Sequence, residues 1–192
     1  MATQAAIRFG VFNPASILAE RADEVSRILR GVDLLALPGT KLKKPGEKVH
    51  FVRCHANHFS VNWGYATGPF TNRSAGCSIF LKKGKYRQSR ITRIQQPPPG
   101  LQGRGGTITY AQGDTVIKVI VAYFPPPPAN RSERASWAIC CNKLADWIDY
   151  ECAVTPQRET LLIGTDANDN LGMINGQPNI DEAGCRASTG RR

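Results

Sequence analysis

Short hydrophobic segments with the spacing of β-strands occupy most of the chain, and they begin with a strand, a helix and a second strand. In the helical segment, Ala22, Val25, Ile28 and Leu29 recur on one face. The second strand is closed by a Pro-Gly pair, which breaks regular structure. These three elements are expected at residues 6–12, 19–30 and 32–37. The chain is therefore predicted to open with a β-α-β unit.

The middle of the chain is β-rich. Its strand-like segments are separated by Gly, Pro and charged clusters, and the proline runs at 97–99 and 125–128 indicate stiff connectors. The expected strands are residues 49–53, 58–65, 75–81, 106–111 and 116–124. We expect these strands to form most of the sheet structure.

A second helix is predicted over residues 131–152, followed by a buried strand at 160–165. Asn130 precedes Glu133 by three residues, which predicts a capping box at the start of this helix. The apolar positions of the helix are Trp137, Cys141, Leu144 and Ile148. The alternation of strands with two helices predicts an α/β (α+β) fold.

Size and composition are those of one globular domain over residues 1–192. The chain has a mass of 21.0 kDa, with 41% hydrophobic and 21% charged residues. The net charge of +10 and the pI near 9.6 favour a polyanionic partner such as nucleic acid, although a basic protein without such a partner has the same composition. Neither a signal peptide nor a membrane-spanning segment is expected, which predicts a soluble intracellular protein without a membrane partner, with the nucleus as one compartment open to it.

The cysteines and histidines form no metal-binding motif. Six cysteines include no C-x-x-C pair, so reduced thiols are favoured over a disulfide framework or a zinc site. His50, His55 and His58 lie close together, but no cysteine pair stands near them at zinc-finger spacing. They are interpreted as strand or loop histidines.

Polar residues follow several predicted strands. Asn13, Thr40 and Tyr123 stand at the ends of three strands, and Asp166 and Asn168 follow a fourth. If the backbone stays extended, Asp166 and Asn168 point the same way, so that a carboxylate and an amide address one atom. This pattern suits a polarised water attacking a phosphoryl group, whereas the alternative is a simple Asx-rich turn.

Five motifs in order resemble the endonuclease/exonuclease/phosphatase superfamily over most of the chain, from Ile7 to about Gly172. A glycine-arginine turn, "LQGRGG", and the helix that begins near Arg134 are similar to members joined to the reverse transcriptases of non-LTR retroelements. The motifs are "VFN" at Asn13, "DLLALPGT" at Asp33 to Thr40, "RSAGCSIFL" at Arg73 to Leu81, "AYFP" at Tyr123 to Pro125 and "IGTDAN" at Ile163 to Asn168. The resemblance implies a four-layer α-β-β-α sandwich of the DNase I-like type, truncated before its last strands.

The resemblance also implies a site for metal-assisted phosphodiester hydrolysis. Asp166 is expected to position or deprotonate the attacking water, Asn168 to orient it, and Tyr123 to contact the phosphate. Asn13 and Asp166 are the implied ligands of Mg²⁺. The loops that carry these residues are expected to converge on one cleft.

Two departures from the family pattern predict a degenerate or inactive site. Gly39 stands where the family has its metal-binding glutamate, and Pro38 stands in place of the preceding glutamine. Mg²⁺ prefers carboxylate oxygens, which glycine cannot supply. The family's terminal Ser-Asp-His segment has no counterpart, since no histidine follows Asp166. The expected protein is an incomplete copy of a retroelement-type endonuclease domain.

Other functions fit the same residues. The segment from Lys82 to Arg93 places six basic residues around Tyr86, and a catalytically dead nucleic-acid-binding remnant would need only such phosphate contacts, whereas a solvated hairpin is the alternative for the same segment. A phosphomonoesterase or lipid-phosphate hydrolase is a further alternative, because a fold does not select a substrate. The residues predicted to bind nucleic acid, most naturally DNA, are Lys82, Lys83, Lys85, Arg87 and Arg104. A reverse transcriptase domain in a longer parent chain is the other partner that the resemblance implies.

Overall fold

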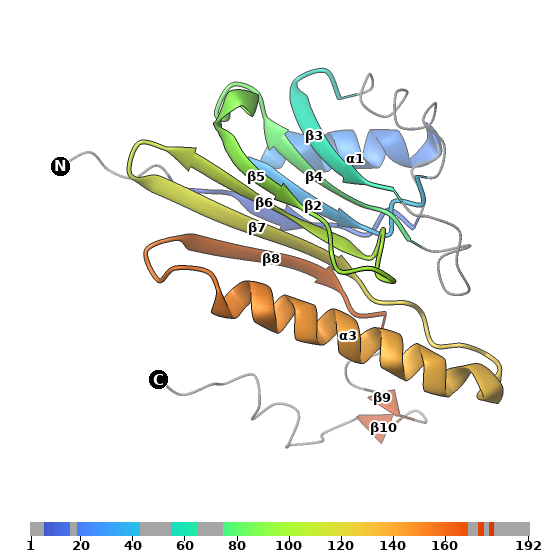
Figure 1. Ribbon diagram of the computed structural model, residues 1–192. Helices are drawn as coiled ribbons and strands as arrows, with labels where there is room; N and C mark the ends of the chain where they lie inside the picture. Colours follow the sequence, from blue (N-terminus) through green and yellow to red (C-terminus); the bar gives the residue numbers. More distant parts are fainter. Residues whose placement is uncertain are drawn as a thin grey trace.

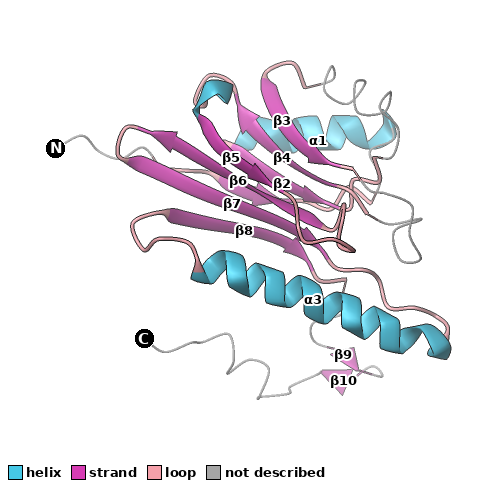
Figure 2. Cartoon of the chain, in the orientation of Figure 1, coloured by secondary structure: helices cyan, strands magenta, loops and turns pink. Residues whose placement is uncertain are grey.

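Two four-stranded β-sheets pack face to face, and a helix covers the outer face of each (Figure 1). The computed structural model describes residues 6–15, 19–42, 55–64, 75–168, 173–174 and 177–178. Helix α1, Ala19–Gly31, packs on the first sheet, and helix α3, Arg134–Ala153, packs on the second. Figure 2 shows the helices on opposite sides of the paired sheets. The predicted α-β-β-α sandwich is confirmed.

Each sheet contains one parallel pair of strands. The first sheet has the order β1-β2-β4-β3 and the second the order β5-β6-β7-β8; β1 is parallel to β2, and β7 is parallel to β8. The strands of the first sheet are β1 Phe9–Val11, β2 Leu34–Pro38, β3 His58–Trp63 and β4 Cys77–Lys82. Those of the second are β5 Ile91–Gln95, β6 Gly105–Gln112, β7 Thr115–Tyr123 and β8 Thr160–Asp166. A short pair, β9 Met173–Ile174 and β10 Gln177–Pro178, follows.

Side-chain alternation along the strands creates three apolar layers. In β2, Leu34 and Ala36 enter the core between the sheets, whereas Leu35 and Leu37 face α1. The same rule places alternate residues of β7 in the inter-sheet core or against α3. Because strands β2 and β7 are buried on both faces, they read as continuous hydrophobic segments.

Most predicted elements match the observed ones. The expected helices at 19–30 and 131–152 correspond to α1 and α3, and the strand predicted at 49–53 lies outside the described residues. Strand β5 was not expected, because its exposed central residues carry no hydrophobic alternation. No helix in the described ranges is long and apolar enough to cross a membrane. The cysteines that the structure describes, Cys77, Cys140, Cys141 and Cys152, are free thiols.

The predicted capping box at Asn130 is wrong. The Asn130 side chain makes no capping hydrogen bond, and a 3₁₀ turn, η2 Arg131–Glu133, precedes α3. In this turn the Glu133 backbone N–H donates to the Asn130 backbone oxygen at 3.2 Å. That N–H is the donor a capping box would use, so the tight turn replaces the cap.

Two glycines of β6 accept a tryptophan on each face of the second sheet. A Cβ added to Gly106 would lie 2.0 Å from Trp63 Cε2 in the inter-sheet core, and one added to Gly105 would lie 2.7 Å from Trp147 Cζ3 on α3. Both rings therefore pack directly on the strand backbone. Side chains at these positions would push the layers apart.

We expect Gly106→Ala to lower the free energy of unfolding by about 3 kcal/mol, the upper end of the usual cost of overpacking a core. Gly84→Ala is the matched control, because a Cβ at Gly84 meets nothing within 4 Å. The control should change the free energy by less than about 0.5 kcal/mol. Urea denaturation compares the two variants. Equal losses of unfolding free energy would show that the packing of Trp63 does not require glycine at position 106.

Asp33, at the start of β2, is a buried carboxylate with two cationic partners. Its oxygens accept from the Arg8 backbone N–H at 3.0 Å, the Arg8 guanidinium at 3.1 Å and Lys85 Nζ at 2.8 Å. Burial raises the pKa of Asp33, but the hydrogen bonds from Lys85 and Arg8 outweigh it and hold the pKa well below its usual range. This group joins β1, β2 and the segment after β4.

A depressed folded-state pKa stabilises the protein above the unfolded pKa of about 3.9, and this contribution is lost as the pH falls through the folded pKa. We therefore expect Asp33→Asn to cost about 2 kcal/mol at pH 7 and progressively less between pH 4 and pH 2. Asp114→Asn, at an exposed turn position, is the control. A cost for Asp33→Asn that does not change with pH would contradict the ion-pair account.

Candidate functional site

Four strands end beside one another and bring together residues far apart in the sequence. The cluster lies where β1, β2, β7 and β8 end, and we call this the cluster end of the sandwich. The polar cluster consists of Asn13, Gly39, Tyr123, Asp166 and Asn168. The loops that carry these residues meet at one end of the sandwich, as predicted, and the cleft expected there stays a prediction.

Strand register places Tyr123 and Asp166 side by side. They are direct partners in the parallel pairing of β7 with β8, and the Phe124 N–H donates to the Asp166 backbone oxygen at 2.9 Å. Leu162 belongs to the inter-sheet core, so the period of two directs Asp166 toward the same side of β8. Tyr123 is 5% exposed and belongs to that core as well.

Asn13 joins the first sheet to Asp166. The Asn13 Nδ2 donates a short hydrogen bond to Asp166 Oδ2, and Asn13 Oδ1 accepts from the Ala15 backbone N–H at 2.7 Å. Both hydrogen bonds require the same orientation of the Asn13 amide, because Asp166 needs a donor nitrogen and the Ala15 N–H needs an acceptor oxygen. Asn13 is thereby fixed between a local turn and the second sheet.

Asn168 does not continue the strand, so the condition under which it would point the same way as Asp166 is not met, and the alternative of an Asx turn is observed. Asn168 has φ +49°, and its backbone N–H donates to Asp166 Oδ1 at 2.9 Å. This is an Asx turn, which competes with extended backbone for the same groups. The Asn168 side-chain Nδ2 donates to the Phe124 oxygen at 2.6 Å and holds the turn on the end of β7.

Gly39 occupies the centre of the cluster. An added Cβ would lie 2.7 Å from Asn13 Oδ1 and 3.1 Å from Tyr123 Cε2, and the backbone has φ +77°. Position 39 therefore faces Asn13 and Tyr123 directly, but in a left-handed conformation that glycine adopts without strain. The resemblance implies a glutamate at this position, and the structure adds that even a Cβ here would crowd Asn13 and Tyr123.

Arg104, predicted to contact nucleic acid, is buried behind Tyr123. It is 1% exposed, its guanidinium carbon lies 5.6 Å from the centre of the Tyr123 ring, and its backbone oxygen accepts from the Tyr123 N–H at 2.7 Å. A cation at this distance from an aromatic face is attracted to it. Arg104 therefore supports Tyr123 from inside the protein.

Loop segments within the motifs quoted above support the cluster, a structural role that the sequence did not assign to them. The Thr40 N–H donates to the Gly76 oxygen at 2.9 Å, and the Gly76 N–H donates to the Gly103 oxygen at 2.8 Å. Gly76 has φ +93°, and a Cβ there would lie 2.6 Å from Thr40 Oγ1. The glycines in "AGC" and "QGR" are the sequence signal for this connection between the sheets.

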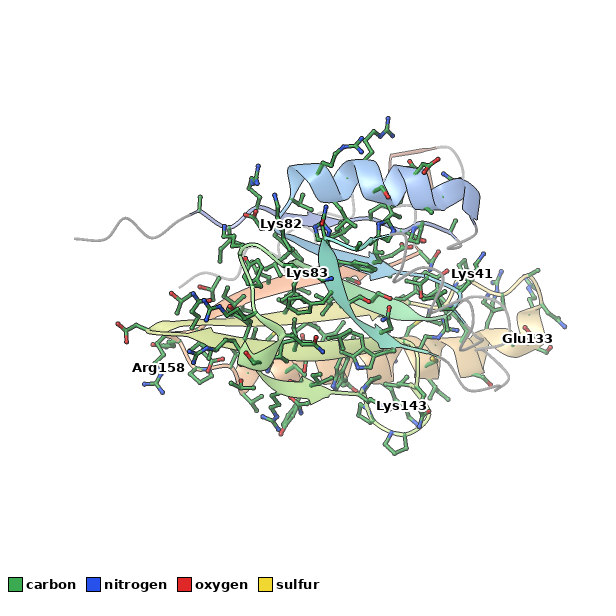
Figure 3. All side chains as sticks on the ribbon, turned by 90° about the horizontal axis from the view of Figure 1, so that it is seen from above. Lys41, Lys82, Lys83, Glu133, Lys143 and Arg158 are labelled. Atoms are coloured by element: carbon green, nitrogen blue, oxygen red, sulfur yellow. The ribbon has the colours of Figure 1, made fainter. Side chains whose placement is uncertain are left out.

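The lysines and Arg87 that were predicted to bind nucleic acid lie at the opposite end of the sandwich. β4 runs antiparallel to β2, so Lys82 follows the residue paired with Leu34, and its N–H donates to the Asp33 oxygen. Figure 3 shows Lys82 and Lys83 away from Lys41, which follows the cluster residue Thr40. Lys85 is already paired with Asp33.

The residues at the cluster do not fit a divalent cation. Of the five, only Asp166 carries a carboxylate, and both of its oxygens, like Asn13 Oδ1, already accept hydrogen bonds. Within the described ranges, no three His, Cys, Asp or Glu residues form a group that could hold a metal. Mg²⁺ is usually held through one or two carboxylates together with phosphate oxygens and water. The Mg²⁺ that the resemblance implies therefore has no complete set of ligands among the described residues.

Comparison with known proteins shows the fold. No family profile and no curated protein matches the sequence. Among solved structures, the 3′ phosphatase NExo from Neisseria bound to a product DNA hairpin is 18% identical, covers 86% of this chain and 59% of its own, and has a TM-score of 0.60. An AP endonuclease from Archaeoglobus fulgidus is 17% identical, with coverages of 88% and 62% and a TM-score of 0.60.

A third solved structure, D. rerio TDP2 complexed with a single-strand DNA product, is 13% identical, with coverages of 84% and 60% and a TM-score of 0.56. The chain thus spans 59% to 62% of the length of these three structures. At such identities the similarity shows a DNase I-like sandwich of the kind found in endonuclease/exonuclease/phosphatase enzymes. Activity and substrate need separate arguments.

We expect Gly39→Ala to lower the free energy of unfolding by about 3 kcal/mol, because it combines left-handed backbone strain with crowding of Asn13. Gly100→Ala is the matched control: Gly100 has φ +89°, but a Cβ there meets nothing within 4 Å. The control should lose about 1 kcal/mol from strain alone. Thermal and urea unfolding compare the two variants, and equal losses would show that position 39 does not press on Asn13.

Proposed function

We propose that this chain is an endonuclease-type domain that receives a nucleic-acid phosphodiester at the polar cluster but does not cleave it efficiently. The observation that carries the proposal is the geometry of Gly39. By the resemblance, its place beside Asn13 and Tyr123 corresponds to the family's metal-binding glutamate; Gly39 carries no carboxylate, and a Cβ there would crowd Asn13 on a left-handed backbone. The hydrogen-bonding groups around it are retained.

A nucleic-acid substrate is supported by charge and by the structural neighbours. The net charge of +10 favours a polyanion, and two neighbours are described as bound to DNA. Arg104 adds a buried positive charge behind Tyr123, which helps to offset the negative charge of a phosphate near Asp166. Neutral and cationic groups thus surround the single carboxylate of the cluster.

Each side chain of the cluster has a proposed role. Tyr123 contacts a non-bridging phosphate oxygen through its hydroxyl, and Asp166 holds a water and can accept its proton. Asn13 and the Asx turn at Asn168 fix the two oxygens of Asp166. Both described histidines, His55 and His58, lie at or just before the start of β3, which is at the other end of the sandwich. They are not placed to protonate a leaving group.

The finer part of the proposal is an endonuclease domain of the non-LTR retroelement type that accompanies a reverse transcriptase. The order of the five motifs supports it, as does the glycine-arginine turn that leads into β6. A coding sequence that continues beyond residue 192 into a polymerase would agree with this assignment, and a stop codon there would oppose it.

We expect the chain with Mg²⁺ to nick supercoiled plasmid DNA no faster than the buffer control. Loss of general acid-base help alone lowers rates by about 10²–10⁴-fold, and a missing metal ligand adds to this loss. Asp166→Asn should leave the background rate unchanged. Mg²⁺-dependent nicking that disappears in Asp166→Asn would contradict the inactive assignment and establish the site as catalytic.

Binding at the cluster is measured separately with a thymidine dinucleotide, which contains one phosphodiester. NMR titration should shift the backbone amides of Asn13, Phe124 and Asn168, and Tyr123→Phe should weaken the effect. Inositol phosphate is the parallel ligand for the alternative lipid-phosphate or monoester function. Shifts with inositol phosphate but not with the dinucleotide would favour that alternative.

A further inference from the structure

The segment from Lys82 to Arg90 carries cations that the described structure leaves without acidic partners. It connects β4 of the first sheet to β5 of the second, around the end of the sandwich opposite the polar cluster. Lys85 pairs with Asp33, whereas the other four cations make no ion pair within the described ranges. We call these four residues the distal basic surface: Lys82, Lys83, Arg87 and Arg90.

Contacts within the protein hold this surface in place. The Lys83 N–H donates to the Asn57 oxygen at 3.0 Å, and Lys83 Nζ donates to the Ala56 oxygen. The Arg87 N–H donates to Tyr110 Oη at 3.4 Å. These bonds use backbone and neutral groups, so the positive charges of the side chains stay uncompensated while the segment itself is fixed.

The distal basic surface is well separated from the polar cluster. The chain from Asp33 to Gly39 is nearly all strand β2, and six residue steps at strand spacing give about 20 Å between the two ends. This distance exceeds the Debye length of about 10 Å at 0.1 M salt. One phosphate cannot contact both ends, and the field of one end is largely screened at the other.

We propose that the distal basic surface is a second docking surface, for the phosphate backbone of a nucleic acid, that acts independently of the polar cluster. Four exposed or half-exposed cations on a fixed segment suit a regular row of phosphates, and such contacts are sequence-independent. The proposal goes beyond the function of the cluster and holds even if the cluster binds nothing. It gives a function to four cations that have no acidic partner among the described residues and that lie at the end of the sandwich opposite the polar cluster.

The test measures affinity for a fluorescent 24-base-pair DNA duplex against salt concentration. The distal variant replaces Lys83, Arg87 and Arg90 by Gln, and the control variant replaces Arg21, Arg27 and Lys143 by Gln, so that both lose three charges. We expect the distal variant to bind at least 10-fold more weakly at 50 mM salt. In a plot of the logarithm of the binding constant against the logarithm of the salt concentration, its negative slope should be shallower by about 2 to 3. The control variant should stay within about threefold of the unmodified chain.

Equal losses in the two variants would mean that net charge alone governs binding, and that result would overturn the proposal. Binding that persists in the distal variant but disappears in Tyr123→Phe would also overturn it, since the polar cluster would then be the only docking site. Duplex binding that persists in Tyr123→Phe supports the proposal, whatever the dinucleotide does at the cluster. The two proposed sites therefore fail or succeed separately.

His58 supplies a local readout of the same event. It pairs with Lys82 across β3 and β4, and its Nε2 is buried with no hydrogen bond among the described groups. Burial lowers the pKa of His58, and Lys82 and Lys83 lower it further. Phosphates seated on these lysines offset their field, so duplex binding should raise the pKa of His58 in an NMR titration. An unchanged pKa with saturating duplex would place the DNA elsewhere.

Discussion

The hydrogen bond from Asn13 to Asp166 is the interaction on which the candidate site depends. It joins residues 153 positions apart and ties the end of β1 to the end of β8. The two strands belong to different sheets, so this bond fixes how the sheet edges meet. Glycine at position 39 permits the bond, because any side chain there would press on Asn13 Oδ1.

The same constraint bears on how the cluster could hold a metal ion. Both oxygens of Asp166 accept hydrogen bonds within the protein, and a Cβ at position 39 would crowd the Asn13 amide. The cluster is thus organised by hydrogen bonds among its own groups. Arg104 supplies positive charge behind the cluster, whereas the distal basic surface lies at the other end of the sandwich, where its field is largely screened from the cluster.

Hydrophobic segments predicted the strands and the two helices, and the resemblance to the family supplied their arrangement as a four-layer sandwich. The two apolar layers on either side of β2 and β7 explain why these strands are continuous hydrophobic segments in the sequence. Polar residues at strand ends located Asn13, Tyr123 and Asp166, since strands that run the same way end at the same edge. Strand β5 escaped prediction because it is an exposed edge without an apolar face. The Asn168 backbone N–H could bond to a neighbouring strand or to the Asp166 side chain, and it bonds to the side chain. The sequence alone does not tell which of these hydrogen bonds forms.

The position of the basic segment relative to the site also required the structure. It follows from the antiparallel pairing of β4 with β2, two strands that are separated in the sequence by β3. The burial of Arg104 has a similar origin. An arginine in a glycine-rich turn suggests an exposed phosphate contact, but Arg104 directly precedes β6 and lies against Tyr123 of β7 and near the cysteines of α3, where it is buried.

The central claim is that the polar cluster is organised without a divalent cation. It is tested most directly by adding Mn²⁺ to ¹⁵N-labelled protein and following the paramagnetic broadening of the amides of Asn13, Phe124 and Asn168. The account predicts that these signals stay as sharp as those of α1 at substoichiometric Mn²⁺. Selective loss of the three signals under those conditions, reversed by Mg²⁺, would contradict it.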